Sequence, residues 1–361
     1  MKKFIANLHY KTDYSLLEKL VLLNLKACSG FYRAITSIRL CLYKYNLIKS
    51  TKVKAYVISI GNITTGGTGK TPLTAEIANY ISNTLNKKVA IISRGYAGSL
   101  SSKNTNVISD GTNILYTAEE AGEEPFWLAQ NCPNSIVITG KSRITSAEKA
   151  ISDYNCEVIL LDDGFQHLKI KRDLNLAVID SKNKFGNDLL LPAGPLREAL
   201  NELKRADKFV ITDKYQSEEK NIEFKNHLEE KYKKITYISP FKPYKLYNIK
   251  TNQELSSEIT TVLAFCGIGQ PDSFFNFIEE MNIQINDKII FKDHYKYTES
   301  DIKLLEKKLN ELKNLAIVTT EKDAVKIADL TENLPIYALQ IKPEIDLDNL
   351  LKDLRDDRKE T

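Results

Sequence analysis

The sequence predicts an α/β fold in which a mostly parallel sheet carries helices on both faces. Between residues 56 and 240, short apolar segments alternate with segments of helical spacing, which is the pattern of strands joined by crossover helices. A glycine-rich turn follows the first apolar segment, and a pair of aspartates ends a later one. Both features therefore belong at the carboxyl edge of the sheet, where α/β proteins bind ligands.

Length and composition indicate a soluble globular protein with room for two domains. The chain has 361 residues, of which 42% are hydrophobic and 27% charged, and its formal net charge is +4. This charge is too small to indicate nucleic-acid binding, and we expect none. The five cysteines are scattered and never spaced as Cys-x-x-Cys, which argues against a zinc site or a disulfide framework and fits a reducing cytosol. We expect no cleavable signal peptide, because residues 1–14 lack an apolar core.

Changes in pattern along the chain predict its domain organisation. The strand and helix alternation is lost around Pro240 and Pro243 and resumes near residue 259. The expected segments are a basic amphipathic helical segment (1–54), the main α/β core (55–240), a linker (241–258), a smaller α/β domain (259–345) and a charged tail that frays (346–361).

The stretch from residue 16 to residue 54 is dense in apolar residues and carries no acid after Lys19. Its spacing predicts one or two amphipathic helices with basic flanks. Lys19, Lys26 and Arg33 interrupt the apolar run before it reaches the ~20 residues that a membrane span requires. The segment is therefore expected to lie on an anionic membrane surface rather than cross it. The alternative is a helical hairpin packed on its own domain with a solvated basic face.

The glycine-rich turn has the composition of a phosphate-binding loop. It connects an apolar strand (56–60) to an amphipathic helix (73–81), the context that such a loop requires. Its glycines allow close approach of the backbone to phosphate oxygens, its lysine supplies positive charge, and its last hydroxyl can ligate Mg²⁺. One position departs from the usual pattern, because Thr64 stands where glycine is expected; the alternative is an ordinary glycine-rich turn. The predicted ATP loop comprises Thr64, Thr65, Gly66, Gly67, Thr68, Gly69, Lys70 and Thr71.

A second motif lies about ninety residues further along the chain. Four apolar residues (158–161) end in Asp162 and Asp163, which is what the metal-organising strand of a P-loop nucleotidase looks like. Two adjacent carboxylates repel each other unless a cation is present. Gln166 and His167 follow, so an amide and an imidazole are expected at the same strand end.

Six blocks in order carry a resemblance to a known family. They are Gly61-Asn62 with the loop through Pro72, Ser93 to Tyr96, Glu120 to Pro125, Asp162 to His167, Leu191 to Glu198, and Lys292 to Tyr295. Between residues 16 and 340 the chain thereby resembles the tetraacyldisaccharide 4'-kinases, the lipid A kinases of Gram-negative bacteria.

The resemblance implies a reaction, a cofactor set and a location. The γ-phosphoryl of ATP would be transferred, with Mg²⁺, to the 4'-hydroxyl of a tetraacyldisaccharide 1-phosphate, a lipid A precursor. Since this substrate stays in the bilayer, the enzyme is expected as a peripheral protein on the cytoplasmic face of the inner membrane. The resemblance therefore favours the membrane-docking interpretation of the N-terminal segment. A monomer is expected.

The family's site residues carry over by motif. Lys70 would steady the β- and γ-phosphates, Thr71 and Asp162 would hold the metal, and Asp163 would support it. The family lines the cleft with residues that match Arg94, Tyr96, Arg143, Gln166, His167 and Arg197.

The resemblance also implies an acid and histidine pair that activates the sugar hydroxyl. These positions are Glu123 and His294, with glutamate where the family usually has aspartate. The extra methylene displaces the carboxylate by about 1 Å, which matters for in-line attack. Because His294 belongs to the smaller domain and the ATP loop to the larger, cleft closure is predicted as part of turnover.

Other classes of nucleotide-binding protein fit less well. A membrane-associated P-loop ATPase switch of the partition type is the main alternative, but such proteins usually have lysine where this chain has Thr65. A GTPase would need an Asn-Lys-x-Asp block, which the sequence lacks. A non-catalytic scaffold would have lost Lys70, Thr71 or Asp162, and all three are present.

Overall fold

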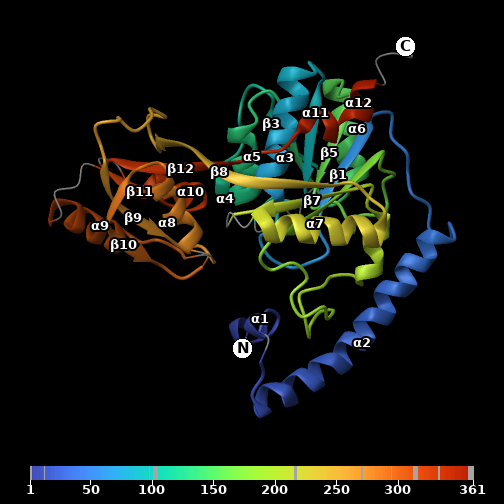
Figure 1. The fold of residues 1–361 in the computed structure, drawn as a ribbon. Coiled ribbons are helices and arrows are strands. Elements are labelled where there is room, and N and C mark those ends of the chain that lie inside the picture. Colours follow the sequence, from blue (N-terminus) through green and yellow to red (C-terminus); the bar gives the residue numbers. More distant parts are fainter. Residues whose placement is uncertain are drawn as a thin grey trace. The chain divides into compact units, whose positions relative to one another are not determined.

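The computed structural model divides into two compact units (Figure 1). The first unit comprises Met1–Pro240 and Ile345–Thr361, and the second comprises Phe241–Glu344. The structure describes residues 2–11, 13–96, 98–100, 105–214, 218–269, 271–293, 295–311, 316–331 and 334–356.

The first unit is built on a mostly parallel sheet. Its strands are β1 (Tyr56–Gly61), β2 (Val89–Ser93), β3 (Asn106–Asp110), β4 (Ile136–Thr139), β5 (Val158–Asp162), β6 (Leu174–Asp180), β7 (Lys208–Asp213) and the first part of β8 (Thr236–Asn248). They lie in the order β8-β7-β6-β1-β5-β2-β4-β3, and only β3 runs antiparallel to its neighbour. β1 and β5 are adjacent with Ile60 opposite Asp162, so the predicted phosphate loop and the aspartate pair leave the sheet side by side.

Helices cover both faces of this sheet, as the sequence predicts. They are α3 (Lys70–Asn79), which continues as a π-helical turn (Tyr80–Thr84), α4 (Ala118–Ala121), α5 (Glu123–Asn131), α6 (Arg143–Tyr154), a 3-10 turn (Leu200–Arg205) and α7 (Glu218–Tyr232). Alternate strand residues face opposite sides. Ile58 therefore packs in one core cluster with Leu73 of α3, and Val57 packs in another with Ala147 of α6.

The N-terminal segment contains α1 (Lys2–Leu8) and α2 (Leu16–Lys44), and Figure 1 shows α2 as one uninterrupted helix. Ser15 caps α2 in a capping box with Glu18. A single helix over this range leaves no room for the hairpin alternative between residues 16 and 44. Among the described residues, none of the helices combines the length and apolar character that crossing a bilayer requires.

The C-terminal segment differs from the fraying tail that we predicted. Residues 347–356 form α11 (Leu347–Leu350) and α12 (Lys352–Asp356). Leu350, Leu351 and Leu354 are almost completely buried in the first unit. The prediction of fraying rested on the high charge of this segment. The charged residues instead make contacts of their own while the leucines are buried: Asp348 accepts a hydrogen bond from the Tyr80 hydroxyl at 2.5 Å and pairs with Arg355 at 2.7 Å.

The second unit has its own sheet, ordered β10-β9-β11-β12-β8. The strands are the second part of β8, β9 (Thr261–Cys266), β10 (Gln284–Ile290), β11 (Ile317–Thr320) and β12 (Ile336–Pro343), and the helices are α8 (Pro271–Glu280), α9 (Glu299–Glu311) and α10 (Glu321–Ile327), followed by a 3-10 turn (Ala328–Leu330). The predicted linker is wrong in its first part, because β8 continues through Asn248 and pairs antiparallel with β12. Pro243 is tolerated because it pairs at a register shift of the ladder.

Candidate active site

The loop after β1 has the backbone geometry of an anion-binding turn. Gly66 and Gly69 adopt left-handed backbone angles (φ +109° and +75°) that favour glycine. Gly69 is the N-cap of α3, so Lys70 begins the helix. The first amides of a helix have no partner within it and attract anions together with the helix dipole. The predicted loop thus ends at a helix N-terminus suited to phosphate.

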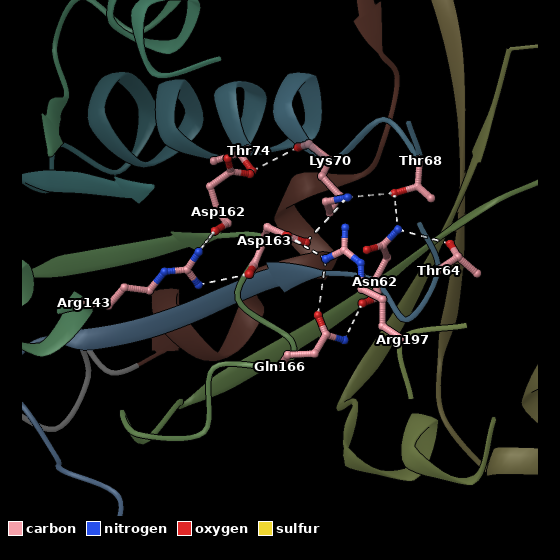
Figure 2. Close-up of polar contacts among 10 residues, drawn as sticks. All are labelled: Asn62, Thr64, Thr68, Lys70, Thr74, Arg143, Asp162, Asp163, Gln166 and Arg197. Atoms are coloured by element: carbon pink, nitrogen blue, oxygen red, sulfur yellow. Dashed lines mark hydrogen bonds and ion pairs between the residues drawn. The ribbon is translucent and has the colours of Figure 1, made fainter. Parts of the chain in front are cut away.

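Side chains within the loop hold it in shape (Figure 2). The Asn62 Nδ2 donates to Thr64 Oγ1 at 3.2 Å and to Thr68 Oγ1 at 3.1 Å. Lys70 Nζ donates to the same Thr68 oxygen at 3.4 Å. Thr64, which stands where the usual motif has glycine, therefore takes part in this network. It also pairs as an isolated bridge with Leu196.

The two aspartates at the end of β5 have different partners. Asp163 lies within 2.7 Å of Arg197 and 3.7 Å of Lys70, and its φ of +50° turns the chain sharply. Asp162 is 3% exposed and accepts a hydrogen bond from Thr74 at 3.5 Å. Asp163 is thus neutralised by cations of the protein, whereas among the described residues the Asp162 carboxylate has only the long contact with Thr74 as a hydrogen bond. Figure 2 shows both aspartates.

The electrostatics of the two carboxylates differ accordingly. Burial raises the pKa of Asp162 to about 7, the charges of Glu124 and Asp163 act in the same direction, and Lys70 and Arg143 oppose them. Burial also acts to raise the pKa of Asp163, but Lys70 and Arg197 outweigh it and hold that pKa below its ordinary value. A carboxylate in the situation of Asp162 favours an additional positive charge nearby.

Arg143 contacts the main chain of the two aspartates rather than their carboxylates. Its guanidinium is buried and donates to the carbonyl oxygens of Asp162 at 2.6 Å and Asp163 at 3.0 Å. Burial lowers its pKa, and the two carboxylates oppose that shift. We predicted Arg143 as a cleft-lining cation, but these contacts make it a support for the turn that orients both carboxylates.

Gln166 and Arg197 link this turn to the phosphate loop. Gln166 Nε2 donates to the Asn62 carbonyl at 2.8 Å, and Arg197 Nη1 reaches Gln166 Oε1 at 3.5 Å. A Cβ on Gly61 would lie 2.5 Å from the Phe165 amide nitrogen, so only glycine allows this close packing. The Asp-Asp-Gly-Phe-Gln-His block therefore fits directly against the end of β1.

Other predicted residues lie apart from this network or outside the described residues. Tyr96 is 82% exposed and Arg94 is exposed after β2. Glu123 is exposed in the first turn of α5. The residue before it, Gly122, packs against Tyr96, because a Cβ on Gly122 would lie 2.7 Å from the Tyr96 carbonyl oxygen. His294 lies outside the described residues. The Glu123 and His294 pair and the cleft closure thus stay predictions.

His167 is partly buried, and its Nε2 has no hydrogen-bond partner among the described residues. Burial lowers its pKa to about 4, and the charge of Arg143 adds to the shift. The imidazole is therefore neutral at physiological pH.

Sequence reasoning missed several residues at this edge. The single hydroxyl proton of Thr74 has two acceptors in reach, Lys70 O at 3.0 Å and Asp162 Oδ1 at 3.5 Å, and its position four residues after Lys70 on a helix could have identified it. Thr212, at the end of β7, donates to the Thr68 carbonyl at 2.8 Å. Glu124 rather than Glu123 raises the pKa of Asp162. The missed side chains are Asn62, Thr74, Glu124, Thr212 and Tyr10, whose hydroxyl reaches Thr65.

Comparison with known proteins gives one consistent result. A family model described as Tetraacyldisaccharide-1-P 4'-kinase matches residues 21–358. Proteins named tetraacyldisaccharide 4'-kinase are 38% identical in Desulfotalea psychrophila, covering 89% of this chain and 92% of that protein, and 35% identical in Halothermothrix orenii, covering 95% and 94%. A crystal structure described as the "apo" form of LpxK from Aquifex aeolicus in complex with ATP matches with a TM-score of 0.73 and 31% identity over 93% of this chain and 98% of that one. The likeness therefore extends over nearly the full length of each protein.

Proposed function

The chain belongs to the tetraacyldisaccharide 4'-kinase family, and we infer from this membership that it transfers the γ-phosphoryl group of ATP to the 4'-hydroxyl of a tetraacyldisaccharide 1-phosphate, a lipid A precursor. The observation that carries the inference is the family match over residues 21–358. The partition-type ATPase alternative is not favoured, because the relatives at 32–38% identity are kinases by name.

We propose that residues 64–71 hold the triphosphate and that Lys70 moves little to reach it. In this structure Lys70 Nζ contacts Thr68 at 3.4 Å and Asp163 at 3.7 Å, both long contacts. Asp163 keeps Arg197 as a closer partner, so Lys70 can turn to the phosphates without leaving an unpaired carboxylate. Phosphoryl transfer depends mainly on such positioning and on electrostatic stabilisation.

Thr71 and Asp162 suit Mg²⁺, with Asp163 in a supporting position. Mg²⁺ prefers oxygen ligands and is usually held by one or two carboxylates together with substrate phosphates. Asp162 supports this pattern, because it is a carboxylate buried at the sheet edge with a raised pKa. The chemistry that a bound Mg²⁺ supplies at this edge is neutralisation of phosphate charge.

We propose that His294 accepts the proton of the 4'-hydroxyl and that Glu123 acts together with it to activate this hydroxyl. The support is their match to the family's motifs, and for Glu123 its place at the exposed start of α5. The cations and polar groups proposed to line the lipid phosphate site are Arg94, Tyr96, Gln166, His167 and Arg197, while Arg143 supports the turn beneath them.

The helix α2 is proposed to dock the enzyme on an anionic membrane as a peripheral monomer at the cytoplasmic face of the inner membrane. Large apolar side chains lie exposed along it at helical spacing, which a soluble surface rarely tolerates. They are Leu16, Leu17, Leu20, Leu23, Phe31, Ile35 and Ile38, with exposed fractions of 53% to 81%. The charged residues of α2 after Lys19 are all basic, which suits an anionic leaflet.

The direct test measures transfer of labelled phosphoryl from ATP to a tetraacyldisaccharide 1-phosphate in detergent micelles. We expect lipid-dependent transfer in the wild type. In Lys70→Ala the rate of transfer should fall by about 10²–10³-fold or more, because the loss of one contact that stabilises the transition state lowers a rate by about this factor. Lys149→Ala, which removes an exposed lysine of α6, is the matched control. In the same assay His294→Ala should lower kcat with an unchanged KM for ATP. ATP hydrolysis that proceeds equally without lipid would favour the ATPase switch instead.

A further inference from the structure

Besides Thr212, two groups outside its motif hold the phosphate loop at Thr65. The Thr65 amide donates to the Pro195 carbonyl at 2.8 Å. The Tyr10 hydroxyl donates to the Thr65 carbonyl at 3.1 Å, across 55 residues of sequence. Both peptide groups that flank the Cα of Thr65 are thus anchored to segments far away in the chain.

The second anchor acts on the peptide that precedes a glycine of the loop. Gly66 has a φ of +109°, and glycine can adopt many backbone angles, so the peptide between Thr65 and Gly66 can rotate unless something holds it. A peptide group is planar and trans, so its N–H points opposite to its C=O. By fixing the Thr65 carbonyl toward itself, the Tyr10 hydroxyl directs the Gly66 N–H away from itself.

Tyr10 itself is held by the preceding residues. The His9 carbonyl accepts a hydrogen bond from the Asn187 amide at 2.9 Å, and His9 Nε2 lies 3.1 Å from the Pro192 carbonyl oxygen. A Cβ on Gly186 would lie 2.6 Å from the His9 carbonyl oxygen, so the two segments pack closely. The loop of residues 186–197, which also supplies Pro195, therefore fixes both anchors.

The same loop is attached to α2. Ser29 Oγ donates to the Leu190 carbonyl at 2.8 Å and accepts from the Ala193 amide at 3.1 Å. Tyr32 donates to the Arg197 carbonyl at 2.9 Å. The helix that carries the exposed apolar residues and the loop that anchors the ATP site are thus one hydrogen-bonded assembly.

We propose that Tyr10 is a positioning residue for ATP: its hydroxyl holds the Thr65–Gly66 peptide so that the Gly66 N–H is presented to the phosphate chain. This inference rests on the proposed role of residues 64–71 in ATP binding. An amide that contacts the phosphates equally in the ground state and the transition state lowers KM and leaves kcat unchanged. The loss of the hydroxyl should therefore appear in the KM for ATP.

The experiment compares Tyr10→Phe with Tyr14→Phe in the full-length protein. Tyr14 is a matched control, because its hydroxyl also donates to a backbone carbonyl, that of Leu8 at 3.0 Å, but not to the phosphate loop. For Tyr10→Phe we expect the KM for ATP to rise about 3- to 10-fold, the effect of one hydrogen bond. The kcat and the KM for the lipid should stay within about twofold, and ATP should raise the melting temperature less than in the wild type.

Two results would overturn the proposal. One is an unchanged KM for ATP in Tyr10→Phe. The other is an equal rise in the KM values for ATP and lipid together with a lower melting temperature without ligand, which would indicate a merely structural role. Lys70→Ala separates this failure from a failure of the proposed function: if Lys70→Ala keeps full lipid-dependent phosphoryl transfer, the assignment of the loop itself is wrong. If Lys70→Ala loses transfer while Tyr10→Phe keeps the wild-type KM for ATP, only the role of Tyr10 is wrong.

Discussion

The carboxyl edge of the sheet and the helix α2 are organised in opposite ways. At the edge, Asn62 bonds within the loop after β1, Gln166 joins that loop to the turn after β5, and Arg143 supports the same turn, all through hydrogen bonds of 2.6–3.2 Å. Asp162 is buried there. On α2, apolar side chains such as Phe31 (73% exposed) lie in solvent. The groups proposed for the chemistry are held by contacts within the protein, whereas these apolar side chains of α2 stay exposed and are proposed to find their partner in a membrane.

Replacing Asp162 and Asp163 by asparagine, one at a time, tests the roles proposed for the two carboxylates at the sheet edge. The first of these variants has the largest expected effect. Asp162→Asn should lower kcat by about 10²–10³-fold, because a developing charge loses its stabilisation, and should leave the melting temperature unchanged or higher, because a poorly paired buried charge is removed. Asp163→Asn should lower the melting temperature by about 1–3 °C, because the contact with Arg197 is lost. Kinetics and thermal unfolding measure both effects.

Asp153→Asn is the control for this pair, since it removes an exposed carboxylate that pairs with Lys149 on α6. It should leave both kcat and the melting temperature near the wild type. Full turnover in Asp162→Asn would mean that this carboxylate has no part in the reaction.

Replacing exposed leucines of α2 tests the proposed docking of this helix on a membrane. The double variant Leu20→Ser and Leu23→Ser should bind vesicles of anionic phospholipid at least tenfold more weakly, because less apolar area can enter the membrane interface. Its melting temperature and its activity on detergent-dispersed substrate should not change. Co-sedimentation with vesicles is the measurement.

Ile222→Ser on α7 is the matched control, because Ile222 is also exposed (46%) but lies outside α2. Vesicle binding should be unchanged in this variant. Equal binding by the double leucine variant and the wild type would show that α2 does not dock on lipid.

The smallest expected effect concerns His167 at the sheet edge and the dependence of the unfolding free energy on pH. Because the pKa of His167 is lowered to about 4, its contribution to stability is fully present above the ordinary pKa of 6.5 and is lost as the pH falls toward 4. His167→Phe cannot take up a proton, so between pH 7 and pH 5 the wild type should lose about 1 kcal/mol more unfolding free energy than the variant. Denaturant unfolding at several pH values checks this, and parallel profiles would contradict it.

The limits of prediction are visible in particular residues. Lys70 and Asp162 could be proposed as site residues because each belongs to a contiguous motif with a strand before it. The linker at 241–258 and the fraying tail were wrong in part, because composition does not show that β8 finds a partner in β12 or that Leu350 and Leu354 find a core. Pairing and burial depend on distant segments, which local pattern does not reveal.

The α/β fold, the glycine-rich turn with its neighbouring aspartates and the family could be recognised from the sequence alone, because these depend on residues that are close along the chain. The folded structure was needed to see that Arg143 supports the main chain, that Asp163 rather than Asp162 has an ion pair with Arg197, and that Tyr10 reaches Thr65. Each of these contacts joins segments that the sheet and its loops bring to one edge. A hydrogen bond between residues far apart in sequence exists only once the fold has placed both partners.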